Sequence, residues 1–331
     1  MRLLKTTLIA AAMSMTLATG TALAEVTLKY GHPNPSESVA GRFADRFAEL
    51  VKEKTNGEVI INVYPASQLG TAKERFEGVQ FGLIDFGHDS YSTVSQALPE
   101  FGALDLPYLY RDVAHAVAAT TPATSPVLRE LNERLKTEAQ MEVIGSYLYG
   151  IRELTTSNFP VNKPEDLSGK RIRAIPVPVW IGMVEGMGAI PTPVDFAELT
   201  TALATGVIDG QENPLTAILT SNMYDTQKYL IMTDHMINII PLFANSGTLE
   251  RLTEDQRKAV HESAQQAGAE ILEISVAEHE TLQGELVAKG MTLINEANGL
   301  DLAAFRSRVS EHVRAKFPEW ASIIEGIQAI E

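Results

Sequence analysis

In the first half of the chain, short apolar segments alternate with longer segments in which apolar and polar residues repeat with a helical period. Short runs rich in β-branched and aromatic residues, such as 59–64, have the composition of strands. Between such runs, apolar side chains recur every three or four positions, as at Val39 and Phe43, which predicts amphipathic helices. Pro122 and Pro126 must break or kink the last of these helices. The predicted elements are strands at 26–30, 59–64, 83–86 and 141–149 and helices at 36–54, 71–81 and 112–139. This alternation favours an α/β class with parallel pairing.

The second half repeats this rhythm and adds one long helix. Asp195 and Glu198 have the pattern of a helix cap, and Thr253 with Gln256 repeats it ahead of the last predicted helix. Strands are predicted at 171–174 and 207–209, and helices at 180–187, 195–205 and 253–289. The last helix is longer than typical globular helices, which indicates a strut between two lobes. No flexible linker interrupts the chain, so we expect structured crossovers to join the lobes.

Residues 1–24 have the three-part pattern of a secretory signal peptide. Arg2 and Lys5 give a positive start, and residues 8–17 form an apolar run that is too short for a membrane span. Residues 22–24, Ala-Leu-Ala, form a small-residue cleavage site; a frayed N-terminal helix is the alternative. The chain has no Cys, so no lipid-anchored Cys and no disulfide is expected. We therefore expect a soluble protein in the periplasm, without a lipid anchor.

The charge balance narrows the range of partners. Without the signal peptide the chain holds 25 basic and 42 acidic residues, a net charge of −17. Such a surface repels nucleic acid and anionic lipid, so neither is expected as a partner. It also repels anionic solutes, so an acidic ligand would need a local buried cation. Arginine suits that role because its planar guanidinium binds a carboxylate through two hydrogen bonds and stays charged when buried.

Three ordered segments in the middle of the chain form its most specific motif. They are residues 170–173 (KRIR), 188–196 (GAIPTPVDF) and 203–214 (LATGVIDGQENP). Together they resemble the central signature of the periplasmic solute-binding proteins of TRAP transporters, the DctP-like family. Residues 64–70 (YPASQLG) are similar to another motif of that family, so the resemblance spans nearly the whole mature chain. One departure is the apolar stretch 174–180, where many relatives carry polar residues, and it implies fewer hydrogen bonds at that edge of the site.

The resemblance implies a two-lobed α/β fold of the periplasmic-binding-protein type, with crossover strands, a long connecting helix and the ligand in the cleft. Residues 25–149 with about 239–278 are expected to form the first lobe, and residues 150–238 with about 279–331 the second. The implied partner is a membrane permease with small and large subunits, driven by an ion gradient. A monomeric carrier would deliver a small organic acid to it. No catalysis, cofactor or metal is expected.

The resemblance also implies roles for particular side chains. Arg173 is expected to anchor the ligand carboxylate, with Arg152 as a second arginine and Asn213 as an amide contact. Without the family, the two arginines would be ordinary salt-bridged residues, and Asn213 would start a helix ahead of Pro214. Phe196 is expected either to pack against the apolar face of the ligand or to belong to the core of its helix.

Further candidates surround this set. Glu212 carries no attractive charge for an acid and is expected to orient neighbouring groups. His235 corresponds to a position near the same network but could equally lie in a solvated loop. Polar residues that follow the first-lobe strands are candidate contacts, because α/β folds bind ligands at the carboxyl ends of strands, although such residues are often only turn formers. These candidates are His32, His88, Asp89, Ser90 and Tyr91.

These side chains favour a carboxylate over a neutral sugar, which would leave a buried guanidinium unpaired. The expected ligand is a C4-dicarboxylate, a hydroxy acid or a sugar acid such as a uronate, and the usual range of the resembled family is the main reason. A second carboxylate on the ligand would require Arg152 to reach it or a histidine to be protonated.

Two other functional classes stay open from the sequence. A secreted hydrolase or lyase could use Asp209 and Glu212 as an acid–base pair. The sequence has no nucleophile elbow, no Cys nucleophile and no phosphate-binding Gly-rich loop, which argues against common enzyme classes. A small-molecule sensor that docks onto a receptor shares the same fold and is not distinguished by sequence.

Export should remove residues 1–24 and leave Glu25 as the N-terminal residue, because the cleavage site ends at Ala24. Mass spectrometry of protein isolated from the periplasm measures the mature mass directly. A mature chain that retains residues 3–17 would contradict the interpretation as a signal peptide.

Overall fold

The computed structural model describes residues 25–331, so the predicted signal peptide lies outside the described residues. The strands are β1 (Val26–Gly31), β2 (Val59–Tyr64), β3 (Phe86–His88), β4 (Met141–Thr156), β5 (Arg171–Ala174), β6 (Ile190–Pro193), β7 (Gly210–Pro214), β8 (Tyr229–Asn245) and β9 (Thr292–Ile294). The α-helices are α1 (Val39–Lys54), α2 (Ala72–Gln80), α3 (Tyr91–Val94), α4 (Val113–Ala119), α5 (Pro126–Ala139), α6 (Pro178–Met187), α7 (Leu199–Ala204), α8 (Leu215–Thr220), α9 (Ser246–Arg251), α10 (Glu254–Ala288), α11 (Leu302–Lys316) and α12 (Ala321–Gln328).

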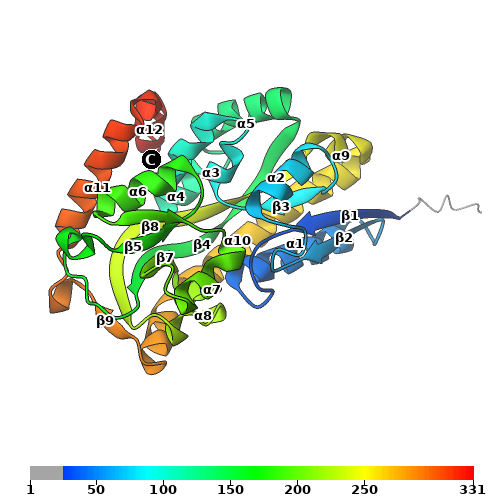
Figure 1. The fold of residues 1–331 in the computed structure, drawn as a ribbon. Coiled ribbons are helices and arrows are strands. Elements are labelled where there is room, and N and C mark those ends of the chain that lie inside the picture. Colours follow the sequence, from blue (N-terminus) through cyan, green and yellow to red (C-terminus); the bar gives the residue numbers. More distant parts are fainter. Residues whose placement is uncertain (1–24) are drawn as a thin grey trace, which may run out of the picture.

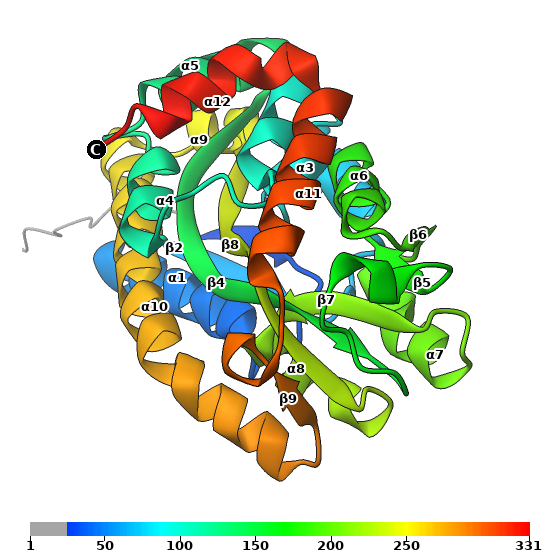
Figure 2. The same cartoon turned by 90° about the vertical axis from the view of Figure 1, so that its left-hand side faces the viewer.

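These strands form one mixed sheet with the order β2-β1-β3-β8-β4-β7-β5-β6, and β9 pairs with β8 (Figure 1). The prediction of parallel pairing is confirmed for β1 with β2 and β3 and for β5 with β6. It is wrong at the centre, where β4 pairs antiparallel with both β7 and β8. The reason is that the chain passes into the second lobe along the 16-residue β4 and returns along the 17-residue β8 (Figure 2). The two lobes of this α/β fold are thus joined by β4 and β8, which pair with each other as they cross from one lobe to the other.

Most predicted elements are confirmed, because their apolar side chains are buried at the expected spacing. The strands at 59–64 and 171–174 have the predicted bounds. The helical region 112–139 is divided into α4 and α5, and Pro126 occupies the first turn of α5, where it needs no amide hydrogen. The long helix α10 begins with the predicted capping box of Thr253 and Gln256.

Two predicted strands are misplaced. The strand expected at 83–86 is β3, which begins three residues later. The helix expected at 195–205 is confirmed with Asp195 as its cap, although its first turn is the 3-10 helix Phe196–Glu198 that precedes α7. The strand expected at 207–209 is instead β7, whose residues are all buried although most are polar. A hydrophobic pattern cannot reveal such a strand, because its polar side chains find their partners inside the protein. Asn213 therefore lies in a strand and does not start a helix.

The sheet separates the hydrophobic clusters of the interior. On β8, Leu242 packs in the cluster formed with α1 and α10, whereas the next residue, Phe243, packs in the cluster formed with α2, α5 and α6. This alternation is the period of two expected for a strand with helices on both faces. A third cluster lies around α7 and α8. Helix α10 runs along β4 and α1, as Figure 2 shows.

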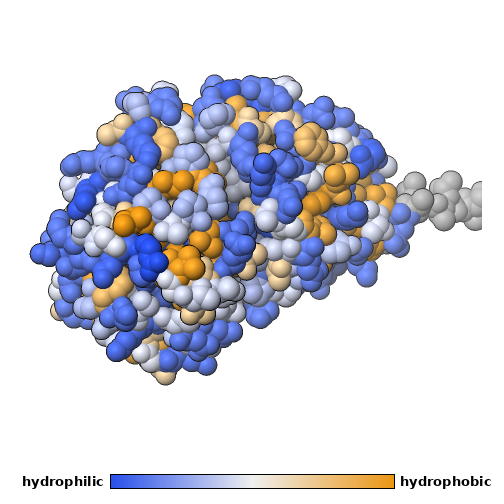
Figure 3. Space-filling model, viewed as in Figure 1, coloured by the Kyte–Doolittle hydropathy of each residue, from blue (hydrophilic) through white to orange (hydrophobic). Residues whose placement is uncertain are grey.

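The C-terminal segment contacts both parts of the molecule. Helix α11 packs against α6, and α12 packs against α5 (Figure 1). The division of the chain into lobes at the residues predicted from the sequence stays a prediction. The face seen in Figure 3 is mainly hydrophilic, with several hydrophobic areas among the hydrophilic ones. Within residues 25–331, no helix combines the length and hydrophobicity that crossing a membrane requires.

Substitution of Gly268 should reveal how closely α10 packs on β4. A Cβ at this position would overlap the carbonyl oxygen of Ser146. We expect Gly268→Ala to lower the free energy of unfolding by about 1–3 kcal/mol, because backbone must move to admit the methyl group. Urea denaturation measures this difference.

Gly284 provides the matched control in the same helix. A Cβ there has no neighbour within 4 Å. Gly284→Ala should therefore raise the free energy of unfolding by about 0.5–1 kcal/mol, the gain from removing a helical glycine. Equal effects of the two substitutions would contradict the close approach of α10 and β4.

Candidate functional site

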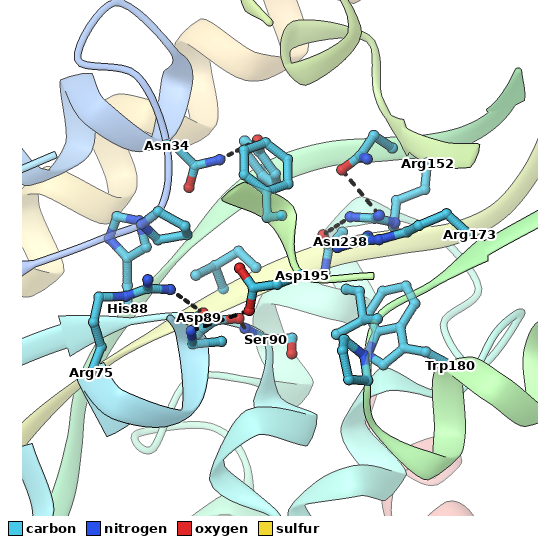
Figure 4. Close-up of a pocket in the computed structure, with 18 of the residues that line it drawn as sticks. Asn34, Arg75, His88, Asp89, Ser90, Arg152, Arg173, Trp180, Asp195 and Asn238 are labelled. Atoms are coloured by element: carbon cyan, nitrogen blue, oxygen red, sulfur yellow. Dashed lines mark hydrogen bonds and ion pairs between the residues drawn. The ribbon is translucent and has the colours of Figure 1, made fainter. Parts of the chain in front are cut away.

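A cavity lies between the two lobes, where β4 and β8 pass from one lobe to the other (Figure 4). Its first-lobe wall comes from the loop after β1, the start of α2 and the segment after β3. The second-lobe wall comes from β5, α6 and the turn after β6. The polar residues that line it are Asn34, Arg75, His88, Asp89, Ser90, Tyr147, Tyr149, Arg152, Arg173, Asp195, Asn213 and Asn238.

The structure brings most of the predicted contact residues to this cavity. They are Arg173, Arg152, Asn213, Phe196, His88, Asp89 and Ser90. Their contact with a ligand stays a prediction. Their convergence from distant parts of the chain nevertheless makes this cavity the candidate binding site.

Four other predicted contact residues do not line the cavity. His32 is fully buried and stacks on His88, with 4.8 Å between the ring centroids. Tyr91 points away from the cavity, and its hydroxyl donates to the carbonyl oxygen of Thr120. Glu212 and His235 are fully buried behind Arg152. Proximity to a strand end in the sequence does not determine which way a side chain points, so His32 and Tyr91 follow strands without lining the cavity. Glu212 and His235 lie in the network around Arg152, as expected. His235 lies in β8 and not in a solvated loop.

Arg152 is held by a buried network. Its Nε and Nη2 donate to the two carboxylate oxygens of Glu212 at 2.5 and 2.9 Å, and Nη2 also donates to Oδ1 of Asn213 at 3.1 Å. His235 Nε2 lies 3.0 Å from the same carboxylate. Burial alone would raise the pKa of Glu212, but Arg152 and His235 outweigh this effect and hold the pKa at about 2. Glu212 is therefore ionised and neutralises the charge of Arg152.

Arg152 in turn orients Asn238, a residue that sequence reasoning missed. Its Nη1 donates to Oδ1 of Asn238 at 3.0 Å, as the dashed line in Figure 4 shows. Among the residues that the structure describes, Nδ2 of Asn238 has no hydrogen-bond partner. Arg152 thus fixes the orientation of the Asn238 side-chain amide: the oxygen accepts from Arg152, and the nitrogen is left without a protein partner.

Arg173 is the lining arginine with unused hydrogen-bonding capacity. Its side chain is 2% exposed, and its Nε donates to the carbonyl oxygen of Val194 at 2.9 Å. Within residues 25–331, its Nη1 finds no partner. Burial lowers the pKa of Arg173 to about 10, with Glu212 acting in the opposite direction, so the group stays protonated at neutral pH. Unpaired buried donors cost free energy, so Nη1 and the Asn238 amide are suited to receive an anionic acceptor.

The first-lobe end of the cavity carries mainly neutral or neutralised groups. Asp89 forms an ion pair with Arg75 at 2.8 Å, and Asn34 donates to the Tyr149 hydroxyl at 2.7 Å (Figure 4). Burial lowers the pKa of His88 well below its ordinary value, so its ring is neutral at neutral pH. Amides, hydroxyls and neutral imidazole suit ligand hydroxyl groups better than a full charge.

Apolar side chains and one acid complete the walls. Trp180 lies under the guanidinium of Arg152, 4.7 Å from the ring centroid, and its Nε1 donates to Ser92 at 2.6 Å. Asp195 reaches across the cleft, where its carboxylate accepts the backbone amide of Ala72 at 3.4 Å. Sequence reasoning treated Asp195 only as a helix cap and had no signal for Arg75, because no local pattern shows that either side chain faces the cavity.

The acid–base pair that an enzyme would need is not assembled here. Asp209 pairs with Arg171 at 2.7 Å, and Asp209 is partly exposed. Glu212 is fully buried, and neither carboxylate lines the cavity. The geometry therefore gives no support to a hydrolase or lyase built on these two residues.

Comparison with known proteins identifies the family. The model of DctP, bacterial extracellular solute-binding protein family 7, matches residues 30–319. The chain belongs to this family. It is 32% identical to a solute-binding protein of Roseobacter denitrificans over 298 residues, which cover 89% of this chain and 88% of that protein. It is 28% identical to the 2,3-diketo-L-gulonate-binding periplasmic protein of Escherichia coli, over 93% of each chain.

Solved structures of family members confirm the two-lobed fold. A TRAP periplasmic solute-binding protein of Roseobacter denitrificans with bound L-galactonate has a TM-score of 0.85 at 30% identity, covering 93% of this chain and 100% of that one. The protein of Ochrobacterium anthropi with bound L-fuconate has a TM-score of 0.86 at 30% identity, covering 92% and 99%. The resemblance found in the sequence is thereby confirmed.

Removal of the Glu212 charge should destabilise the family 7 protein strongly at neutral pH. Glu212→Gln leaves Arg152 buried without its anion, so we expect the free energy of unfolding to fall by about 3–5 kcal/mol. Asp209→Asn removes a partly exposed ion pair instead and should cost about 1 kcal/mol or less. Chemical denaturation of the three proteins measures both effects.

The effect of Glu212→Gln should depend on pH. The pKa of Glu212 is about 2 in the folded protein, against an ordinary value of 4.5. Its charge therefore stabilises the fold fully above the ordinary value, and this contribution is lost as the pH falls from 4.5 toward 2. The stability difference between wild type and Glu212→Gln should shrink over that range. A difference that stays constant with pH would contradict the ionised state of Glu212.

Proposed function

We propose that this protein is the periplasmic subunit of a TRAP transporter that captures a sugar acid, of the aldonate type, by its carboxylate. The observation that carries the proposal is the pair of unused donors at one end of the cavity, Nη1 of Arg173 and Nδ2 of Asn238. A ligand carboxylate would satisfy both and would balance the charge of Arg173. Charge-assisted hydrogen bonds of this kind are about twice as strong as neutral ones.

The rest of the cavity supports a hydroxylated chain on this acid. Asn34, Ser90 and His88 present amide, hydroxyl and imidazole groups at the first-lobe end. Phe196 and Trp180 supply apolar walls against which the carbon chain can lie. The relatives from Roseobacter denitrificans and Ochrobacterium anthropi hold L-galactonate and L-fuconate, both monocarboxylic sugar acids. Of the three ligand classes open from the sequence, the sugar acid is therefore the one we propose.

We infer that the protein binds and releases its ligand without chemical change. Two of the acids near the ligand are engaged by arginines, Asp89 by Arg75 and Glu212 by Arg152, which supports a binding role. We further propose that the protein acts as a monomer without a lipid anchor and passes its ligand to the membrane permease of the transporter. Ligand would close the cleft, because residues of both lobes line the cavity.

Arg173 should decide affinity for the carboxylate. Isothermal titration of wild type should show binding of L-galactonate and none of galactitol, which keeps the hydroxyls but lacks the charge. Arg173→Ala should weaken L-galactonate binding by about 30-fold or more, the effect of removing one partner from a desolvated charge pair. Arg173→Lys should restore little, because an ammonium cannot reproduce the planar donors of arginine.

Arg171 is the matched control, since it belongs to the same sequence motif but pairs with Asp209 at the surface. Arg171→Ala should leave the affinity for L-galactonate nearly unchanged. Wild-type affinity in Arg173→Ala, or equal binding of galactitol and L-galactonate by wild type, would contradict the proposed function.

A further inference from the structure

We propose that Asp195 makes this site selective for ligands with a single negative charge, by excluding a second carboxylate and accepting a ligand hydroxyl in its place. The inference rests on the proposed function, because it assumes a sugar acid whose first carboxylate lies at Arg173. It names a residue that takes no part in the carboxylate anchor, and it concerns the part of the ligand that extends away from Arg173.

Asp195 is held in place from both lobes. It follows β6 and precedes the 3-10 helix Phe196–Glu198, whose Ala197 amide donates to Oδ1 at 3.1 Å. Across the cleft, the amide of Ala72 at the start of α2 donates to Oδ2 at 3.4 Å. Figure 4 shows the carboxylate in the middle of the site, between Arg173 on one side and Asp89 on the other. A carboxylate fixed in this way meets any ligand that extends from Arg173 toward the first lobe.

The charges around the cavity leave no cation for a second ligand carboxylate. Arg152 is neutralised by Glu212, and Arg75 by Asp89. Arg173 has no acidic partner of its own, so the first carboxylate of the ligand completes its charge balance. Asp195 forms no ion pair with any residue in the range 25–331; its hydrogen bonds come from backbone amides, and Arg173 acts on it only through space. A second carboxylate would therefore face an uncompensated charge of the same sign.

Histidine protonation does not provide that cation either. His88 faces the cavity and His32 stacks on it. Burial, with Arg75 nearby, lowers the pKa of His32 to about 4, and burial lowers the pKa of His88 well below its ordinary value. Both rings are neutral at neutral pH. The two routes by which a dicarboxylate could have been accommodated, through Arg152 or through a protonated histidine, are thus closed.

A ligand hydroxyl fits the same position. Each carboxylate oxygen of Asp195 already accepts one backbone amide, and each has a further lone pair free to accept. A terminal hydroxymethyl group can donate one hydrogen bond there without adding charge. Asp195 is partly buried, and a site that reserves such an acceptor for a ligand hydroxyl disfavours ligands that lack the donor.

The test compares two ligands that differ only at the far end. Galactarate has the hydroxyls of L-galactonate but carries a second carboxylate in place of the terminal hydroxymethyl group. Isothermal titration at fixed ionic strength gives the ratio of their dissociation constants. We expect wild type to prefer L-galactonate by about tenfold or more, and Asp195→Asn to reduce this preference by about tenfold, because the amide keeps an acceptor but removes the charge.

Two further variants separate charge from structure. Asp195→Ser keeps a side chain that can cap the following turn, removes the charge, and should reduce the preference in the same direction. Glu198→Gln removes the same amount of charge from an exposed residue three positions later and should leave the ratio unchanged. Thermal unfolding of each variant shows that it is folded before titration.

The other possible results would overturn the role of Asp195, the selectivity or the proposed function. An unchanged ratio in both Asp195 variants, or an equal change in Glu198→Gln, overturns the role of Asp195. A wild type that binds galactarate as tightly as L-galactonate overturns the selectivity while leaving the carboxylate anchor at Arg173 intact. A wild type that binds neither acid, nor any other sugar acid, overturns the proposed function itself and the selectivity with it.

Discussion

The buried ion pair between Arg152 and Glu212 is the interaction on which the site depends. Glu212 comes from β7 and Arg152 from β4, and the pair is linked to β8 through His235 and Asn238. Loss of either partner alone would leave the other charge buried and unpaired where the three strands meet, at a cost of several kcal/mol. The pair also removes Arg152 from competition for the ligand. It leaves Arg173 as the anchor and turns the free amide of Asn238 toward the cavity.

Local and overall electrostatics oppose each other in this protein. Residues 25–331 carry a net charge of −17, which repels any anion approaching from solvent. Inside the cleft, Arg173 is shielded from water and from most of that charge, so its attraction for a carboxylate acts in a low-dielectric setting. Salt weakens the long-range repulsion much more than the buried contact. Recognition is therefore decided by a few buried groups and not by the surface as a whole.

The sequence predicted what depends on local spacing and missed what depends on distant partners. Helix α10 and strand β2 were predicted because their apolar residues are buried at regular intervals. Strand β7 was misplaced because its buried side chains are polar and are satisfied by β4. Arg173 was found through a family motif, whereas Asn238 carried no local signal and Asp195 only that of a helix cap. Asn238 matters because of Arg152, a residue 86 positions away, and such pairings exist only once the chain is folded.

The two long crossover strands couple the stability of each lobe to that of the other. The chain enters the second lobe along β4 and returns along β8, and these strands are hydrogen-bonded to each other nearly throughout. A single cut in the chain therefore cannot release one lobe whole. Melting one lobe also unpairs strands that the other lobe needs, so the two lobes are expected to unfold as one cooperative unit. Evolution could exchange surface loops of such a protein freely, but it could not exchange one lobe for another by simple recombination of gene segments.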